Sequence, residues 1–446
     1  MACSRLRPES PYARVKLMLA VGYVLAVGLS CPAPVSRGPA ASAERGDEVV
    51  LFFTGSELGA LKPCGCSGGQ LGGLEKRTSI FGRVPPAERL VVDTGGLVAG
   101  DREQDLIKFR ILFEAYGLLG YDLVHLAARD MEIAATLNLR TDAKRPFDII
   151  RAAAENGRSG PFVKEFDTAG GKLVVNVAAL DLQQSRIQQA GDFFPEAAAT
   201  LNILLLSDDG GISVQDLLAT APETIDCIVY PSQFDEPQLL TEPGESPLVL
   251  SVGRFGRHIC KLSVKVGGQA GQIAMQFEDI PVTADLPDDP ALSQLYRYYQ
   301  QLVKESGLLE NYPRLPLPDG LTYVGSKTCE KCHEYEYQRW ATKAHADAFA
   351  TLERVGSDYD PECVVCHVVG MEYASGFVTP ERTPQLKNVG CENCHGPGSE
   401  HVSSFGVTGT VEPKMTCLQC HTPEHSSGYA GHEAEFLEKI THWREP

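Results

Sequence analysis

Basic residues are too few in this chain of 446 residues to balance its acids. There are 40 Lys and Arg residues against 58 Asp and Glu residues, and the formal net charge is −18. A surplus of acids argues against nucleic acid as a partner. It favours a partner protein that presents a basic docking face.

The N-terminus lacks an apolar run long enough to span a bilayer comfortably. Residues 17–29 are apolar and follow several basic residues, which is the pattern of a signal peptide. Gly28-Leu29-Ser30-Cys31 resembles a bacterial lipobox, although Gly28 stands where Leu or Val is usual, and cleavage there would leave Cys31 lipid-modified as a membrane tether. The alternative is cleavage after Ala41-Ser42-Ala43. We favour the lipoprotein. Residues 32–45, rich in Pro, Ala and Ser, are typical of a tether in either case.

Cysteine is present at 14 positions, and ten of these lie in close pairs. The pattern C-x-x-C-H occurs four times between residues 329 and 421, where this composition would give roughly 0.01 occurrences by chance. Two thiols three residues apart can each form a thioether with a haem vinyl group, and the following histidine then supplies an axial nitrogen to the iron. The residues of the four motifs are Cys329, Cys332, His333, Cys363, Cys366, His367, Cys391, Cys394, His395, Cys417, Cys420 and His421.

Zinc sites and disulfides are the alternative uses of such cysteines. A zinc ribbon usually joins two C-x-x-C pairs in one site and needs no histidine beside each pair. The motifs therefore predict four covalently attached haem c groups. Attachment of haem c takes place outside the cytoplasm, so we expect an exported protein of the periplasm or outer cell envelope.

The same part of the chain has five further histidines that could act as second axial ligands: His345, His401, His425, His432 and His442. A second histidine gives a low-spin haem that transfers electrons, whereas an iron without one can bind a small molecule. In about 120 residues, haems of this size would supply most of the core, so we expect short helices and loops whose structure depends on haem.

The region from residue 47 to 285 alternates apolar strands with helical patterns, which predicts an α/β domain with a mixed sheet. Residues 286–320 are predicted to form a helix ending at Gly307 and then a proline-rich linker, and residues 321–446 the haem domain. The helix could pack on either side. The expected strands are residues 49–53, 90–93, 122–126, 173–177, 201–206, 226–230, 248–252 and 258–264, and the expected helices begin near Leu74 and cover residues 105–119.

Motifs in this region follow one another as in the calcineurin-like metallophosphatase and 5′-nucleotidase family. They are residues 72–77 (GGLEKR), 91–96 (VVDTGG), 120–122 (GYD) and 253–256 (GRFG). The resemblance implies that fold. It also shows what is missing, since the family's D-x-H becomes Thr54-Gly55-Ser56-Glu57, its G-D becomes Gly95-Gly96, and its G-N-H-E becomes 127–130 (AARD). A two-metal hydrolytic site needs carboxylates and imidazoles at those places, so we expect phosphatase chemistry to be lost.

A glycine-rich loop with two thiols, Cys64 and Cys66, precedes Gly72. One interpretation is a redox or metal-binding pair, joined by Cys227, Cys260 or His258; the other is a structural disulfide to Cys227 or Cys260. We expect His125, within an apolar strand, to be a hydrogen-bonded core residue.

Residues 321–446 resemble the cytochrome c-554/c-prime family of tetrahaem electron carriers from end to end. The resemblance lies in residues 323–329 (YVGSKTC), 340–346 (WATKAHA), 390–401 (GCENCHGPGSEH) and 440–442 (ITH). It implies that His345, His401 and His442 are distal ligands, and the family commonly has one five-coordinate haem.

The sequence therefore predicts an exported multihaem cytochrome that relays electrons between redox partners. One alternative is an oxidoreductase acting on a small nitrogen, sulfur or oxygen compound at a five-coordinate haem. Another is a non-catalytic protein that binds a ligand or partner through the phosphatase-like pocket.

Overall fold

The computed structural model describes most of the chain from residue 46 onward. The described residues are 46–63, 70–140, 144–152, 161–194, 200–208, 210–242, 245–267, 272–411, 417–423, 425–426 and 428–443. The signal peptide, Cys31, Cys64 and Cys66 lie outside these ranges, so the predictions made for them stay predictions.

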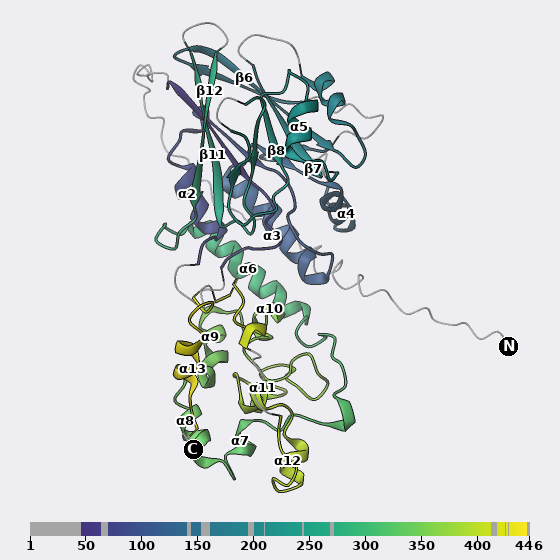
Figure 1. The fold of residues 1–446 in the computed structure, drawn as a ribbon, viewed down its shortest axis with the longest axis vertical. Helices are drawn as coiled ribbons and strands as arrows, with labels where there is room; N and C mark the ends of the chain where they lie inside the picture. The colour runs from purple at the N-terminus through teal and green to yellow at the C-terminus, as the bar shows by residue number, and fades with distance from the viewer. Residues whose placement is uncertain are drawn as a thin grey trace, which may run out of the picture. The chain divides into compact units, whose positions relative to one another are not determined.

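Two six-stranded sheets form the framework of the N-terminal part (Figure 1). The first has the order β12-β11-β1-β2-β3-β4 and the second the order β5-β6-β7-β8-β10-β9. The strands are β1 (Glu48–Thr54), β2 (Arg89–Asp93), β3 (Leu123–His125), β4 (Asp148–Ile150), β5 (Phe162–Thr168), β6 (Gly171–Asp181), β7 (Thr200–Asp208), β8 (Cys227–Tyr230), β9 (Gln238–Leu239), β10 (Leu248–Ser251), β11 (His258–Val266) and β12 (Ile273–Pro281).

Both faces of the central strands are buried. Along β1, Val49, Leu51 and Phe53 enter a core shared with strands of the second sheet. The alternate residues Val50 and Phe52 enter another core made with helices. Because successive side chains of a strand point to opposite faces, this double burial explains the unbroken apolar run in the sequence.

Helices cover the outer faces of both sheets. Residues of α2, α3 and α6 pack in one core with β1 and β2, and residues of α5 and η2 pack against β6 to β8 on the other side. The helices and single turns of this part are α2 (Leu74–Phe81), η1 (Pro86–Glu88), α3 (Glu103–Leu119), α4 (Ala128–Thr136), η2 (Ile187–Phe193), α5 (Val214–Thr220) and α6 (Pro290–Ser306).

The predicted α/β fold is confirmed, with a difference in its sheets. All eight expected strands and the helices at Leu74 and residues 105–119 are present within a few residues of their predicted bounds. The strands form two sheets rather than one mixed sheet, and β4, β5, β9 and β12 were not predicted. Helix α6 begins after the Asp289 cap and ends at Gly307, and its apolar residues Leu292, Leu295, Tyr299 and Val303 belong to the core of the α/β part.

The C-terminal part consists of short helices joined by loops, as expected (Figure 1). Its apolar core is small and is made by Leu309, Phe349, Leu352, Val364, Val368, Val369, Met371, Phe377 and Leu386. The elements are η3 (Pro318–Gly320), α7 (Ser326–Cys329), α8 (Glu334–Trp340), η4 (Ala344–Asp347), α9 (Ala348–Val355), α10 (Pro361–Val364), η5 (Pro384–Leu386), α11 (Cys391–His395), α12 (Ser399–Ser403), η6 (Cys417–Gln419) and α13 (Glu433–Ile440).

The proline-rich segment after α6 is tied to this C-terminal part. The Leu315 amide donates to the Glu372 carbonyl over 2.8 Å, and the Ala374 amide donates to the Leu315 carbonyl over 2.9 Å. The Arg314 guanidinium donates to the carbonyl of Phe377. Among the described residues, no helix has the length and apolar character needed to cross a membrane.

Candidate functional site

Each C-x-x-C-H motif begins within or directly after a short helical turn. The His333 amide bonds to the Cys329 carbonyl at 2.9 Å, and the His421 amide bonds to the Cys417 carbonyl at 2.8 Å. Residues three and four apart in such a turn are neighbours, so the two thiols and the imidazole of one motif can bind the same ligand.

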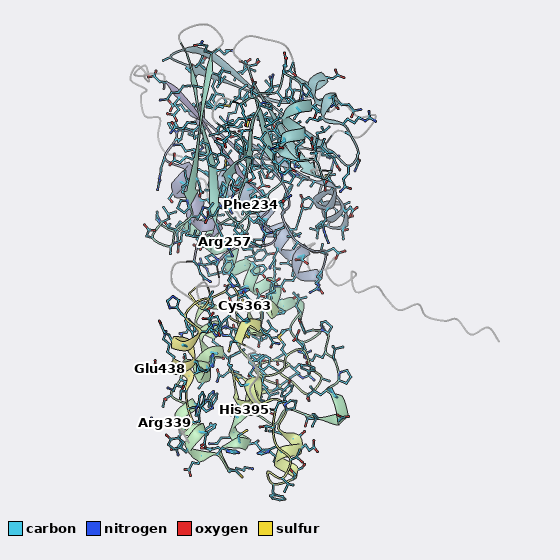
Figure 2. All side chains as sticks on the ribbon, in the orientation of Figure 1. Phe234, Arg257, Arg339, Cys363, His395 and Glu438 are labelled. Atoms are coloured by element: carbon cyan, nitrogen blue, oxygen red, sulfur yellow. The ribbon has the colours of Figure 1, made fainter. Side chains whose placement is uncertain are left out.

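The four motifs lie close together, although up to 92 residues of sequence, 329 to 421, separate their ends. The side chains of Cys329 and Cys391 lie close enough to shift each other's pKa, and Cys366 likewise shifts the pKa of Cys420. The first motif therefore adjoins the third, and the second adjoins the fourth. Figure 2 labels Cys363 and His395 within this group of short helices.

Two pairs of histidine rings lie at a separation that suits two ligands of one iron. The ring centres of His333 and His401 are 5.9 Å apart, and those of His345 and His421 are 6.3 Å apart. Two imidazoles bound to opposite faces of one iron, each through a bond of about 2 Å, place their ring centres about 6 Å apart. Each pair joins a motif histidine to one of the histidines that the sequence singled out as a distal ligand.

Hydrogen bonds fix which nitrogen of these rings is available. Nδ1 of His401 bonds to the Thr408 carbonyl at 2.7 Å, Nδ1 of His442 to the Ile440 carbonyl at 2.9 Å, and Nδ1 of His367 to the Ala348 carbonyl at 2.6 Å. A carbonyl only accepts, so Nδ1 carries the proton in each ring. Nε2 is then the unprotonated nitrogen that a metal needs, an arrangement common among metal-bound histidines.

Burial lowers the pKa of three imidazoles of this cluster, those of His345, His395 and His421. It lowers the pKa of His345, and the nearby His421, His367 and His442 lower the pKa further. Burial also lowers the pKa of His395, next to the charges of His442 and His333. A neutral ring is the form that binds iron.

The remaining histidines differ from one another in their surroundings. His442 lies close enough to His395 to help lower the pKa of that ring, which makes it the candidate partner for the third motif. Within the described part of the chain, no ring contact joins His367 to another histidine. His432 is exposed and pairs with Glu435 at 3.2 Å, and Nδ1 of the exposed His425 bonds to the Thr422 hydroxyl.

Glu392, inside the third motif, joins that motif to the first one. Its buried carboxylate accepts hydrogen bonds from the amides of Val324, Gly325 and Gly398, at 2.7 to 3.1 Å. The adjacent Asn393 donates from Nδ2 to the Val368 carbonyl at 2.9 Å, next to the second motif. The two residues between the cysteines of the third motif therefore hold three motifs together.

The donor set and the surface of this part fit haem. The ring centres of two histidine pairs lie about one iron's two ligand bonds apart, and the motif cysteines lie in the same short turns as the motif histidines. Large apolar side chains are exposed beyond the small core of this part, as expected of a polypeptide that packs on an apolar cofactor. They are Val402, Phe405, Val407, Val411, Leu418, Leu437 and Trp443.

In the α/β part, a buried hydrogen-bonded network occupies the ends of β1 and β2, where the phosphatase motifs are altered. Nη2 of Arg77 pairs with the Glu57 carboxylate at 2.7 Å, and both side chains are fully buried. Nη1 of Arg77 donates to the Tyr121 hydroxyl, which bonds to the Thr54 hydroxyl at 2.8 Å. Thr54 in turn donates to Asp93 at 2.7 Å.

The three loops that follow β1, β2 and β3 pack directly on each other. The Ser56 amide bonds to the Gly95 carbonyl at 2.7 Å, and the Asp130 carboxylate accepts from the amides of Gly96 and Leu97. A Cβ atom on Gly256 would lie 1.9 Å from the Arg77 guanidinium. Among the described residues, no group of three or more His, Cys, Asp or Glu side chains could hold a metal ion.

The other candidate residues of the α/β part are buried or paired within the fold. Nδ1 of His125 bonds to the Thr94 carbonyl and Nε2 to the Ser207 hydroxyl, both at 2.9 Å, which confirms a hydrogen-bonded core histidine. Cys227 and Cys260 are free, fully buried thiols in the core between the sheets. His258 pairs with Asp279 at 2.8 Å.

Residues 328–396 match the model of the family described as cytochrome c554 and c-prime. The C-terminal part is a cytochrome c554-like domain. The family carries covalent haem c, and c-type cytochromes are typically extracytoplasmic. The matched residues contain three of the four motifs, which fits a multihaem electron carrier. A search of curated proteins found no relative of the chain.

Solved structures of nucleotidases were also matched. A 5′-nucleotidase precursor from Thermus thermophilus is 14% identical, with a TM-score of 0.43, over 70% of this chain and 68% of that one. A NAD nucleotidase from Haemophilus influenzae is 12% identical, with a TM-score of 0.40, over 65% of this chain and 72% of that one. Similarity at this level assigns no activity to this chain.

Several residues of the site were not found from the sequence. Glu392 and Asn393 lie at the variable positions of a motif, and Ser326, whose hydroxyl accepts from the Cys391 amide, precedes the first motif. No signal in the sequence marked Glu392, because its burial is a property of the tertiary structure.

Proposed function

We propose that the chain is an exported cytochrome that carries four covalently bound haems and relays electrons between redox partners. The observation that carries this proposal is the opposition of histidine rings from separate segments at about 6 Å, the spacing of two axial ligands. Haem supplies reversible one-electron chemistry at iron when bound.

Different residues of the chain attach the haems and supply the iron ligands. Each cysteine pair attaches one haem, and His333, His367, His395 and His421 provide the proximal nitrogens. His401 opposes His333 and His345 opposes His421, as the ring contacts support. His442, which helps lower the pKa of His395, is the candidate partner of that ring. Because cysteines of the first and third motifs, and of the second and fourth, lie side by side, the haems that they attach would be neighbours, as electron transfer along the domain requires.

Acidic surface residues suit a basic redox partner. Glu334 and Glu336 begin α8 directly after His333, and Glu433 and Glu435 begin α13. Together with the net charge of −18, they would attract a basic docking face that comes within about a Debye length, roughly 8 Å at physiological ionic strength.

A second function, reaction with a small molecule at iron, is favoured by His367. Among the described residues its ring has no opposing histidine, while its Nδ1 is held by the Ala348 carbonyl. A proximal histidine held in this way, without a distal one, is the arrangement of a haem that binds a ligand.

A carbon monoxide difference spectrum of the dithionite-reduced, haem-loaded protein tests these assignments. The proposal expects three low-spin irons that do not bind carbon monoxide and one that does, at the second motif. Binding at no iron would remove the second function and leave the relay. Binding at two or more irons would contradict the histidine pairs.

A further inference from the structure

The peptide of the second motif is held by the α/β part of the molecule. Asp360, three residues before Cys363, is buried at the start of α10. Nε2 of Gln104 in α3 donates to its Oδ1 at 2.7 Å, and the Tyr299 hydroxyl in α6 donates to its Oδ2 at 2.8 Å. Gln104 and Tyr299 are themselves bonded at 2.9 Å, so the three side chains form a closed buried triad.

Further contacts reinforce this attachment. Lys108, one turn after Gln104, has a buried side chain whose ammonium pairs with Glu362, the residue before Cys363, at 2.5 Å. Gln300 of α6 donates to the carbonyl of Val355 and to the hydroxyl of Ser357. Figure 2 labels Cys363 close to this junction. The first, third and fourth motifs have no comparable contacts with α3 or α6 among the described residues.

Asp360 also caps α10, since its carboxylate accepts from the Glu362 amide at 3.0 Å. One carboxylate therefore receives bonds from α3, from α6 and from the helix that carries Cys363 and leads to His367. Because buried charge-assisted hydrogen bonds fix geometry closely, a change in α3 or α6 is transmitted to the haem-attaching peptide.

We propose that Gln104, Tyr299 and Asp360 are positioning residues through which the α/β part sets the properties of the haem at Cys363, Cys366 and His367. This inference rests on the proposed function, since it requires that motif to carry haem. It gives the α/β part a role that needs no metal, which is to support a motif whose histidine has no ring contact with another histidine among the described residues.

The test uses the full, haem-loaded chain and three variants. Tyr299→Phe removes the hydroxyl that bonds to both Gln104 and Asp360. Asp360→Asn keeps a good helix cap but removes a charge. Tyr298→Phe is the matched control, because Tyr298 lies beside Tyr299 on the same helix and is 42% exposed. The readouts are the midpoint potential of each haem, from a spectroelectrochemical titration, and the carbon monoxide affinity.

We expect Tyr299→Phe and Asp360→Asn each to move one potential, that of the second motif, and to change the carbon monoxide affinity. In Asp360→Asn the potential rises, since loss of a nearby negative charge disfavours the oxidised iron. Tyr298→Phe leaves all potentials unchanged. Loss of haem from the second motif alone, seen by peptide mass, supports the inference too.

Unchanged potentials in both variants, or an equal shift of all haems, would overturn the inference even if the variants unfold more easily. A wild-type protein with fewer than four haems would instead overturn the proposed function. The two failures are therefore distinguishable.

Discussion

The imidazole rings of His345 and His421 lie with their centres 6.3 Å apart, although 76 positions separate them in the sequence. His421 belongs to the fourth haem motif, and His345 lies in the single turn before α9. Both rings are kept neutral because burial lowers their pKa. Their relationship makes His345 the ligand whose removal should affect one haem alone.

Replacing His345 with alanine should turn one haem from low-spin to high-spin. We expect about a quarter of the haem absorbance to change character, because one iron in four loses its sixth ligand while its thioethers keep it attached. Visible and electron paramagnetic resonance spectra of the oxidised protein measure this. His432→Ala is the control, since His432 is exposed and pairs only with Glu435. An unchanged spectrum in His345→Ala would rule out this pairing.

Glu392→Gln should loosen the connection between the first and third motifs. Three backbone amides donate to the Glu392 carboxylate, and an amide side chain can accept at only one of its two positions. We expect a loss of about 1–3 kcal/mol in the free energy of unfolding. Chemical denaturation followed by the Soret band measures it. The exposed Glu400, changed to Gln, should lose less than about 0.5 kcal/mol; equal losses would show that the network contributes nothing.

The α/β part should lose stability as the pH rises, because Asp93 loses a proton that the folded state binds more tightly. Burial, with the neighbouring Glu57 carboxylate, raises the pKa of Asp93 to about 7, whereas the ordinary value in an unfolded chain is 3.8. The folded state therefore binds a proton more tightly, and this contribution to stability is present below about pH 4 and lost as the pH rises to about 7.

Asp93→Asn has no such proton to lose. Thermal unfolding followed by far-ultraviolet circular dichroism from pH 4 to pH 8 compares the two proteins. We expect the wild type to lose more stability than Asp93→Asn over this range. Parallel curves would mean that Asp93 titrates at the same pH when folded and unfolded.

Without haem, the two parts of the molecule should behave differently. The sheets bury large apolar cores of their own, whereas the core of the C-terminal part ends at Leu386 apart from Tyr429. In a variant with all eight motif cysteines changed to alanine, we expect hydrogen exchange to stay slow in β1, β6 and β7. Exchange should become fast beyond residue 387. Slow exchange there would show that the polypeptide packs without its cofactor.

Local features of this fold could be predicted from the sequence, because they depend on neighbouring residues. The apolar run of β1 and the Asp289-Pro290 start of α6 with its end at Gly307 are examples. The division into two sheets could not be predicted. It depends on the pairing of β1 with β11, whose residues are more than 200 positions away, as in Phe53 with Cys260.

The candidate site also has features that the local sequence predicts and others that only the tertiary structure sets. The haem-attaching residues follow from a local pattern, and the surplus histidines from composition. Which ring opposes which, and the bond from Gln104 to Asp360 across 256 positions, depend on the tertiary structure. Both are contacts between polar residues with no periodic pattern in the sequence.

The most direct test of the account is the number of haems on the mature protein. The pyridine haemochrome absorbance per chain, with mass spectra of the digested peptides, gives both the number and the places of attachment. We predict four haems, one on each of the peptides containing Cys329, Cys363, Cys391 and Cys417. A correctly matured chain with fewer than four, or with haem missing from any of these peptides, would contradict it.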